Sequence, residues 1–77
     1  MQDQPTTIWK LRRGELDAEC RVRLMPYGIE VDLLRGGAVV LTRTFETDAE
    51  ALEWAERKRG ARELDGWQRV ELAADAA

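Results

Sequence analysis

The chain has 77 residues, of which 44% are hydrophobic and 35% are charged. This length accommodates one small domain and excludes two, because domains most often have roughly 100 to 150 residues. The composition is that of a folded globular chain and excludes a fibrous or wholly disordered protein. Twelve basic and fifteen acidic residues give a net charge of −3. This charge argues against a nucleic-acid-binding module, since such modules usually carry a basic excess.

The ends of the chain and its rare residues bear on compartment and chemistry. The N-terminus lacks the basic and apolar regions of a signal peptide, and no apolar run approaches the roughly 18 residues of a membrane span. The single cysteine, Cys20, cannot form an internal disulfide, which agrees with a reducing compartment. We therefore expect a cytoplasmic protein. The absence of histidine removes the commonest general base and metal ligand, so no metal site, cofactor or small-molecule substrate is predicted.

Polarity divides the chain into two short tails and one domain. Residues 1–6 are polar without periodicity and predict a mobile N-terminal tail, and residues 73–77 predict a frayed C-terminal tail. Between them, residues 7–72 are expected to form the single domain. Its segments 7–13 and 18–25 alternate apolar and polar residues, which is the period of a half-buried strand.

After the break Pro26-Tyr27-Gly28, residues 29–35 alternate again and predict a third strand. If Pro26 and Tyr27 form the loop, the second and third strands make an antiparallel hairpin whose register can be checked residue by residue. The pairing across this loop places apolar residues opposite apolar residues and both arginines opposite carboxylates. The predicted pairs are Leu24 with Ile29, Arg23 with Glu30, Val22 with Val31, Arg21 with Asp32 and Cys20 with Leu33. A slip of one residue would put every apolar side chain opposite a charge, which fixes the register.

Gly36-Gly37 can supply the positive φ angles of a tight reversal, so a fourth strand is predicted over residues 39–45. A three-residue loop would keep Val39 and Leu41 on the face of the third strand's apolar residues and would turn Arg43 inward. We expect the Arg43 side chain to lie near a sheet edge and to reach water along its aliphatic stem.

A helix is predicted to begin at Thr47, whose hydroxyl can accept a hydrogen bond from the amide of Glu50 while the Glu50 carboxylate returns to the amide of Thr47. The helix could end at Gly60, but Gly66 is the better stop, as a left-handed cap with Trp67 folding back. The apolar sector of the helical wheel consists of Ala51, Leu52, Trp54, Ala55 and Ala61.

Together these elements predict an α+β domain in the order ββββα. A four-stranded antiparallel meander sheet would be covered on one face by one C-terminal helix, with charges of both signs on the open face. A chain of this size buries a modest core, so a homodimer through an edge strand or through the helix would add stability. We carry the dimer and the monomer as equal alternatives.

The first candidate site is a basic strip on the open sheet face. The strip consists of Lys10, Arg12, Arg21 and Arg23. Four cations on a flat face could hold the phosphates of a nucleic acid. The hairpin register, however, sets carboxylates opposite the arginines of the second strand, and Glu19 is expected near Arg12. A solvated face that neutralises its own charges is therefore favoured.

The aromatic residues are the second candidate. Trp9, Trp54 and Trp67 could stack on bases or anchor a partner. Their positions on the inner faces of the first strand and helix, and after the helix cap, instead predict one shared aromatic core. Tyr27 at the hairpin tip is the aromatic residue that we expect to be exposed.

The remaining polar groups favour structural roles. Glu30 and Asp32 share a strand face, but the arginines opposite would keep both carboxylates ionised and unsuited to acid–base catalysis. Cys20 is expected to be a small buried hydrophobe rather than a reactive thiol. We therefore expect no catalytic residue and no enzyme.

The stretch Phe45–Trp54 fits the pattern F-x-T-x-x-E-A-x-x-W. It resembles the strand-to-helix junction of the arm-type DNA-binding domains of tyrosine recombinases, which implies a sheet that enters the DNA major groove. Those modules are basic on the reading face, whereas the third strand here offers Glu30 and Asp32, so no DNA-contacting residue is carried over. Across residues 9–67, the order of strands, P-Y-G turn, G-G turn and alanine-rich helix is similar to small stand-alone bacterial proteins of unknown function.

The sequence thus predicts a non-enzymatic protein that acts by binding another protein or itself. No membrane partner is expected. The alternative is a weak nucleic-acid-binding module that uses the basic strip.

Overall fold

The structure, a computed structural model, describes residues 5–72. The elements are β1 (Thr6–Arg13), β2 (Leu16–Met25), β3 (Gly28–Arg35), β4 (Ala38–Phe45), α1 (Asp48–Leu64) and β5 (Gln68–Val70). Residues 1–4 of the predicted N-terminal tail and the whole predicted tail 73–77 lie outside the described residues, while Thr6 already belongs to β1.

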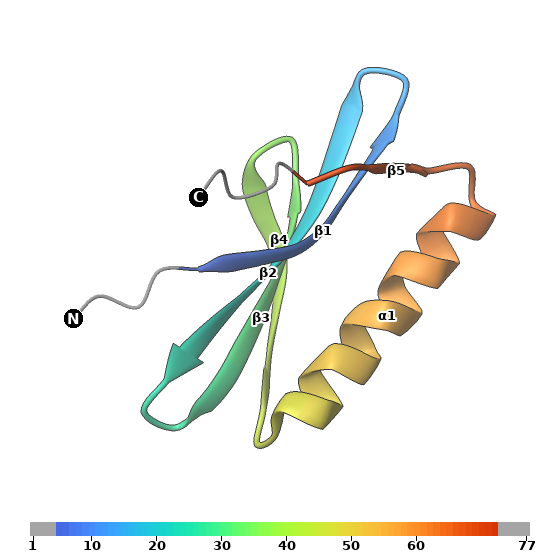
Figure 1. Ribbon diagram of the computed structural model, residues 1–77. Coiled ribbons are helices and arrows are strands. Elements are labelled where there is room, and N and C mark those ends of the chain that lie inside the picture. Colours follow the sequence, from blue (N-terminus) through green and yellow to red (C-terminus); the bar gives the residue numbers. More distant parts are fainter. Residues whose placement is uncertain (1–4, 73–77) are drawn as a thin grey trace.

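The strands form one antiparallel sheet in the order β4-β3-β2-β1-β5, and α1 lies along one face of it (Figure 1). The first four strands make the predicted meander, so the α+β class and the order of these elements are confirmed. The sequence did not predict β5, which returns from α1 to pair with β1. Three residues are too few for an alternating pattern to reveal a strand.

The β2–β3 hairpin has the predicted register. All five predicted pairs are present, from Leu24 opposite Ile29 to Cys20 opposite Leu33. Gly28 ends the hairpin turn with a φ of 150°, and a Cβ placed on it would lie 2.5 Å from the carbonyl oxygen of Phe45. Glycine therefore allows the start of β3 to approach the end of β4 closely.

The β3–β4 connection is shorter than predicted. Gly36 and Gly37 alone form the turn, and a bulge between Leu33 and Leu34 changes the register of β4. As a result Val39 lies opposite Leu34, on the open face, and its predicted inward position is wrong. After the bulge the strand recovers the predicted alignment, in which Arg43 lies opposite the buried Val31.

The core lies between the sheet and α1, and the three tryptophans belong to it as predicted. Trp9 donates a hydrogen bond from its indole nitrogen to the carbonyl oxygen of Ala55 at 2.9 Å, which ties β1 to the middle of the helix. Trp54 stands on the helix and Trp67 follows its C-terminal cap. The buried Cys20 and Val31 complete the floor of the sheet beneath them.

The helix has the predicted ends. The Thr47 hydroxyl accepts from the amide of Glu50 at 3.2 Å, and the turn at Gly66, with a φ of 97°, closes the other end. Three of the five residues of the predicted apolar sector are buried, Ala51, Trp54 and Ala55, whereas Leu52 and Ala61 are exposed. Leu52 lies about 160° around the axis from Trp54 on a helix of 3.6 residues per turn, so it faces solvent when Trp54 faces the sheet.

Candidate functional site

The structure brings the basic strip together on the open sheet face, but its arginines of β1 and β2 already have partners. Arg12 pairs with Asp17 at 3.2 Å, rather than with the predicted Glu19. Arg21 pairs with Glu19 on its own strand at 2.8 Å, although Asp32 lies opposite it in the backbone register. Arg12 thus pairs with the residue directly opposite it on β2, and Arg21 pairs with a carboxylate two residues earlier on its own strand.

A connected network holds Arg23, the third arginine of the strip. Its guanidinium contacts Glu30 at 2.5 Å and Asp32 at 3.2 Å. The Thr42 hydroxyl donates to Asp32 at 2.7 Å, and the Tyr27 hydroxyl donates to Glu30 at 3.2 Å. Tyr27 is exposed at the hairpin tip as predicted, with its hydroxyl in this network.

The hydrogen bond from Arg21 lowers the pKa of Glu19, with a smaller contribution from the hydroxyl of Thr7, against the opposing effect of burial. Lys10 is the one residue of the strip without an ion pair within residues 5–72. The geometry therefore favours the interpretation of this surface as a solvated face that neutralises its own charges.

The thiol of Cys20 is fully buried on the helix side of β2, as predicted. Burial, and then the charge of Asp32, raise the pKa of Cys20 to about 12. The thiol is therefore protonated near neutral pH and is a poor nucleophile. Across the part of the chain that the structure describes, no group of three or more cysteine and carboxylate residues is arranged to hold a metal ion.

No helix within residues 5–72 is both long enough and apolar enough to cross a membrane.

The sequence analysis missed a second surface, at the β4 edge. β4 is the outermost strand on its side, and within residues 5–72 no strand pairs with its outer backbone. Every side chain from Ala38 to Thr44 is exposed. Among these, Val39, Val40 and Leu41 form a run of exposed apolar residues. A long, exposed, apolar edge strand is a template for pairing with another strand.

Next to this edge, a shallow groove of about 420 Å³ lies between β4 and α1. We call it the β4-side groove; it is lined by Arg43, Phe45, Trp54, Arg57, Lys58 and Ala61. The Arg43 guanidinium lies 5.7 Å from the centre of the Trp54 ring, and the Lys58 ammonium lies 5.3 Å from it. These are cation–π distances, and they fix both cations at the groove walls.

The charges of the groove have no ionic partner among the residues that the structure describes. In the described residues, none of Arg43, Arg57 and Lys58 forms an ion pair. The same surface continues past Ala61 to a second hollow that includes Arg35. This cationic and aromatic surface can accept carboxylates or other anions, in contrast to the neutralised basic strip.

One sequence signal pointed towards this surface. The run Val39-Val40-Leu41 interrupts the alternation expected of a strand with one buried face, which is typical of a bulge at a sheet edge. Arg43 joins Lys58 only because the β4 register and the position of α1 bring two separate elements together.

No protein-family model, curated protein or solved structure matches the chain.

Proposed function

We propose that the protein is a non-enzymatic interaction module that works by self-association, with β4 pairing edge to edge with β4 of a second copy. The observation that supports this proposal is the exposed outer strand, with three consecutive apolar residues over Val39–Leu41. Pairing would give the outer amide and carbonyl groups of β4 hydrogen-bond partners and would remove apolar surface from water.

The composition of β4 supports pairing. Natural edge strands are commonly protected by proline, by lysine, by several charges or by a bulge. β4 has no proline and a single charge, Arg43, and its bulge is confined to the Val39–Leu41 segment. The bulge lies near the Gly36-Gly37 end of the strand, so the segment Leu41–Phe45 stays regular and can provide the backbone ladder. The opposite edge has only the three residues of β5.

A symmetric dimer follows from this arrangement. Two copies of one strand pair antiparallel around a two-fold axis perpendicular to the sheet, so the contact is the same surface on both copies. The result is one continuous sheet of both chains, with both copies of α1 on the same face and running in opposite directions. The basic strip supports no second function here, because its three arginines are ion-paired.

The test is sedimentation of the protein over a range of concentrations, comparing wild type with Val40→Lys. Val40 is 56% exposed on β4, and Leu24, which is 63% exposed on the inner strand β2, provides the matched control Leu24→Lys. We expect a dimer for wild type and for Leu24→Lys, and a weakened dimer for Val40→Lys. A lysine on a pairing edge introduces a charge that loses water when the strands pair and that is repelled by the same lysine of the second copy.

Amide hydrogen exchange locates the interface. Alternate amides of β4 should become protected as the protein concentration rises into the dimer range, since outward-facing amides gain partners only in the dimer. Amides of β5 should not change. A wild-type protein that stays monomeric at high concentration, or a dimer with no gain of protection in β4, would overturn the proposal.

A further inference from the structure

Resting on the proposed self-association, we infer that the β4-side groove receives the acidic first half of α1 from the second copy, so that charge pairing between the two helices selects the partner. The groove wall contributed by α1 carries Arg57 and Lys58, in the second half of that helix. The first half of the same helix is acidic, with Asp48, Glu50 and Glu53 before the first basic residue.

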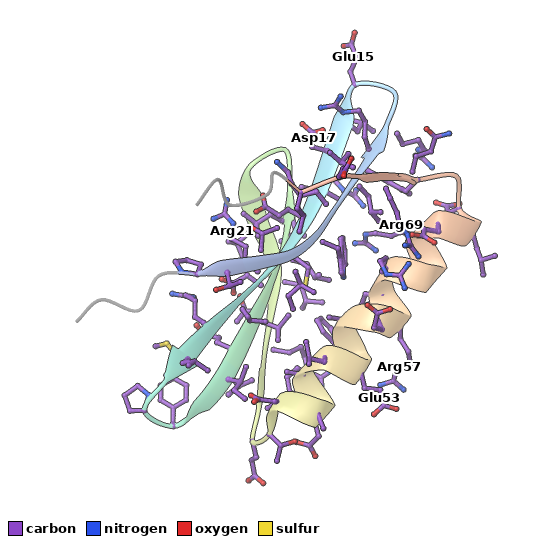
Figure 2. The ribbon with its side chains drawn as sticks, in the orientation of Figure 1. Glu15, Asp17, Arg21, Glu53, Arg57 and Arg69 are labelled. Atoms are coloured by element: carbon purple, nitrogen blue, oxygen red, sulfur yellow. The ribbon has the colours of Figure 1, made fainter. Side chains whose placement is uncertain are left out.

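Two of the acidic residues stand one helical turn before residues that line the groove. Glu50 precedes Trp54 by four residues, and Glu53 precedes Arg57 by four residues. Residues four apart lie one above the other on a helix, and both Trp54 and Arg57 line the groove. Figure 2 shows Glu53 and Arg57 next to each other on α1, with both side chains pointing away from the sheet.

None of these four charged residues is neutralised by a partner within the described chain. Over residues 5–72, Glu50, Glu53, Arg57 and Lys58 form no ion pair. The opposite flank of α1 is different, since Arg59 there contacts both Glu56 and Glu63. The groove flank is thus the one side of the helix where both charge signs are present and available to another molecule.

The two-fold symmetry of the proposed dimer would make the charges of the two helices complementary. Because the two copies of α1 run in opposite directions on the same face, the acidic half of each helix faces the basic half of the other. The two-fold axis produces this contact twice. Parallel helices would instead set acid against acid and base against base, so the charge pattern favours the same antiparallel arrangement that edge pairing requires.

The test is a charge-swap experiment. One variant carries Glu50→Lys and Glu53→Lys, and the other carries Arg57→Glu and Lys58→Glu. In either variant alone, both helix contacts set like charges against each other, and we expect the dimer dissociation constant to rise about tenfold or more. In an equimolar mixture, every contact joins opposite charges again, so a heterodimer with near wild-type affinity should form.

A control separates this effect from a change of net charge. The variant with Glu15→Lys and Glu71→Lys carries the same change of charge as the first swapped variant, at exposed positions away from the groove. Figure 2 shows Glu15 at the tip of the β1–β2 hairpin, pointing into solvent. This control should dimerise like wild type. Circular dichroism of each variant establishes that it is folded.

The outcomes distinguish the two proposals. If wild type and both swapped variants dimerise equally, or if the mixture does not restore the dimer, the helix contact is overturned while edge pairing stands. If wild type itself is monomeric, edge pairing and the helix contact fall together. Wild-type binding of a polyanion such as heparin, with loss of binding in Arg57→Glu, Lys58→Glu and no dimer, would assign the groove to a different anionic partner and would overturn the inference.

Discussion

The two flanks of α1 differ in whether the chain completes its own charge pairs. On the flank near β1 and β5, Glu63 accepts from Arg59 at 2.9 Å and from Arg69 at 2.7 Å. On the flank near β4, Arg43 and Lys58 contact aromatic rings, and neither has an ion pair in the part of the chain described. The first flank is complete within one chain, whereas the second offers charge to another molecule.

The two edge strands of the sheet also differ in how much surface they leave open to another strand. β5 covers β1 with three residues, of which Gln68 and Arg69 are polar and exposed. Short, polar edges of this kind resist pairing. β4 offers eight residues with an exposed apolar run at Val39–Leu41. The features that favour pairing with another strand therefore lie at the β4 edge.

The largest expected effect comes from the core at the C-terminal end of α1, where the two flanks meet. Trp67 is 5% exposed beneath the guanidinium groups of Arg13 and Arg35, which lie 5.2 Å and 5.8 Å from its ring centre. Trp67→Ala removes a buried aromatic side chain between α1 and β5, so we expect the free energy of unfolding to fall by about 3 to 5 kcal/mol. Urea denaturation followed by circular dichroism measures this loss.

Leu64 provides the control for that experiment. It is 92% exposed at the end of α1. Leu64→Ala should change the free energy of unfolding by less than about 0.5 kcal/mol, as is usual for exposed positions. Equal losses in the two variants would show that Trp67 does not close this side of the core.

An intermediate effect is expected where β3 meets the end of β4. Gly28→Ala would place a Cβ 2.5 Å from the carbonyl oxygen of Phe45, at a φ of 150°. The strands must separate there or the backbone must change its conformation, at a cost of about 1 to 3 kcal/mol. Gly14 is the control, because its φ is also positive but a Cβ there meets no atom within 4 Å.

Thermal denaturation of both glycine variants gives the comparison. Gly14→Ala carries only the backbone strain of a positive φ, so Gly28→Ala should have the lower melting temperature. Because Gly28→Ala acts at the end of β4, it should also loosen the hydrogen bonds between β3 and β4. Equal melting temperatures would contradict the close approach of Gly28 to Phe45.

The sequence predicted the parts of the fold that local rules determine. Alternation and opposite charges fixed the β2–β3 register, including Arg23 opposite Glu30, and Thr47 and Gly66 marked the helix ends. The failures at β5 and β4 were non-local. No short pattern reveals that Gln68–Val70 returns to β1, and none reveals the bulge that puts Val39 on the open face. Leu52 is a local error, because its angle from Trp54 on the helix already places it towards solvent.

The same division applies to the candidate sites. The sequence placed Arg21 and Arg23 correctly on the open face, because strand alternation determines the face. It did not predict the β4-side groove, because that surface joins Arg43 of β4 to Lys58 of α1, and their proximity depends on a bulge and on how the helix lies on the sheet. The sequence also missed some side-chain partners. Arg21 forms its ion pair with Glu19 on its own strand and not with Asp32 on the neighbouring strand.

The smallest expected effect is a change in the pKa of one carboxylate, Glu63, which differs between variants on the two flanks of α1. The hydrogen bond from Arg69, and then the one from Arg59, lower the pKa of Glu63 below its ordinary value near 4.5, against the effect of burial. Arg69→Gln should therefore raise the pKa of Glu63 towards that value. Arg57→Gln, on the β4 flank, should leave it unchanged, because Arg57 is not among the groups that shift it.

The sign of the pH dependence follows. A carboxylate whose pKa is lower in the folded state contributes stability at pH values above its unfolded-state pKa, and this contribution is lost as the pH falls through the folded-state pKa. Wild type should thus lose slightly more stability than Arg69→Gln on acidification below about pH 4.5. Titration of the Glu63 carboxyl carbon by NMR measures the shift in each variant. If the pKa of Glu63 responded equally to Arg57→Gln and Arg69→Gln, both flanks of α1 would belong to one charge network. The contrast between a paired flank and an unpaired flank would then be wrong.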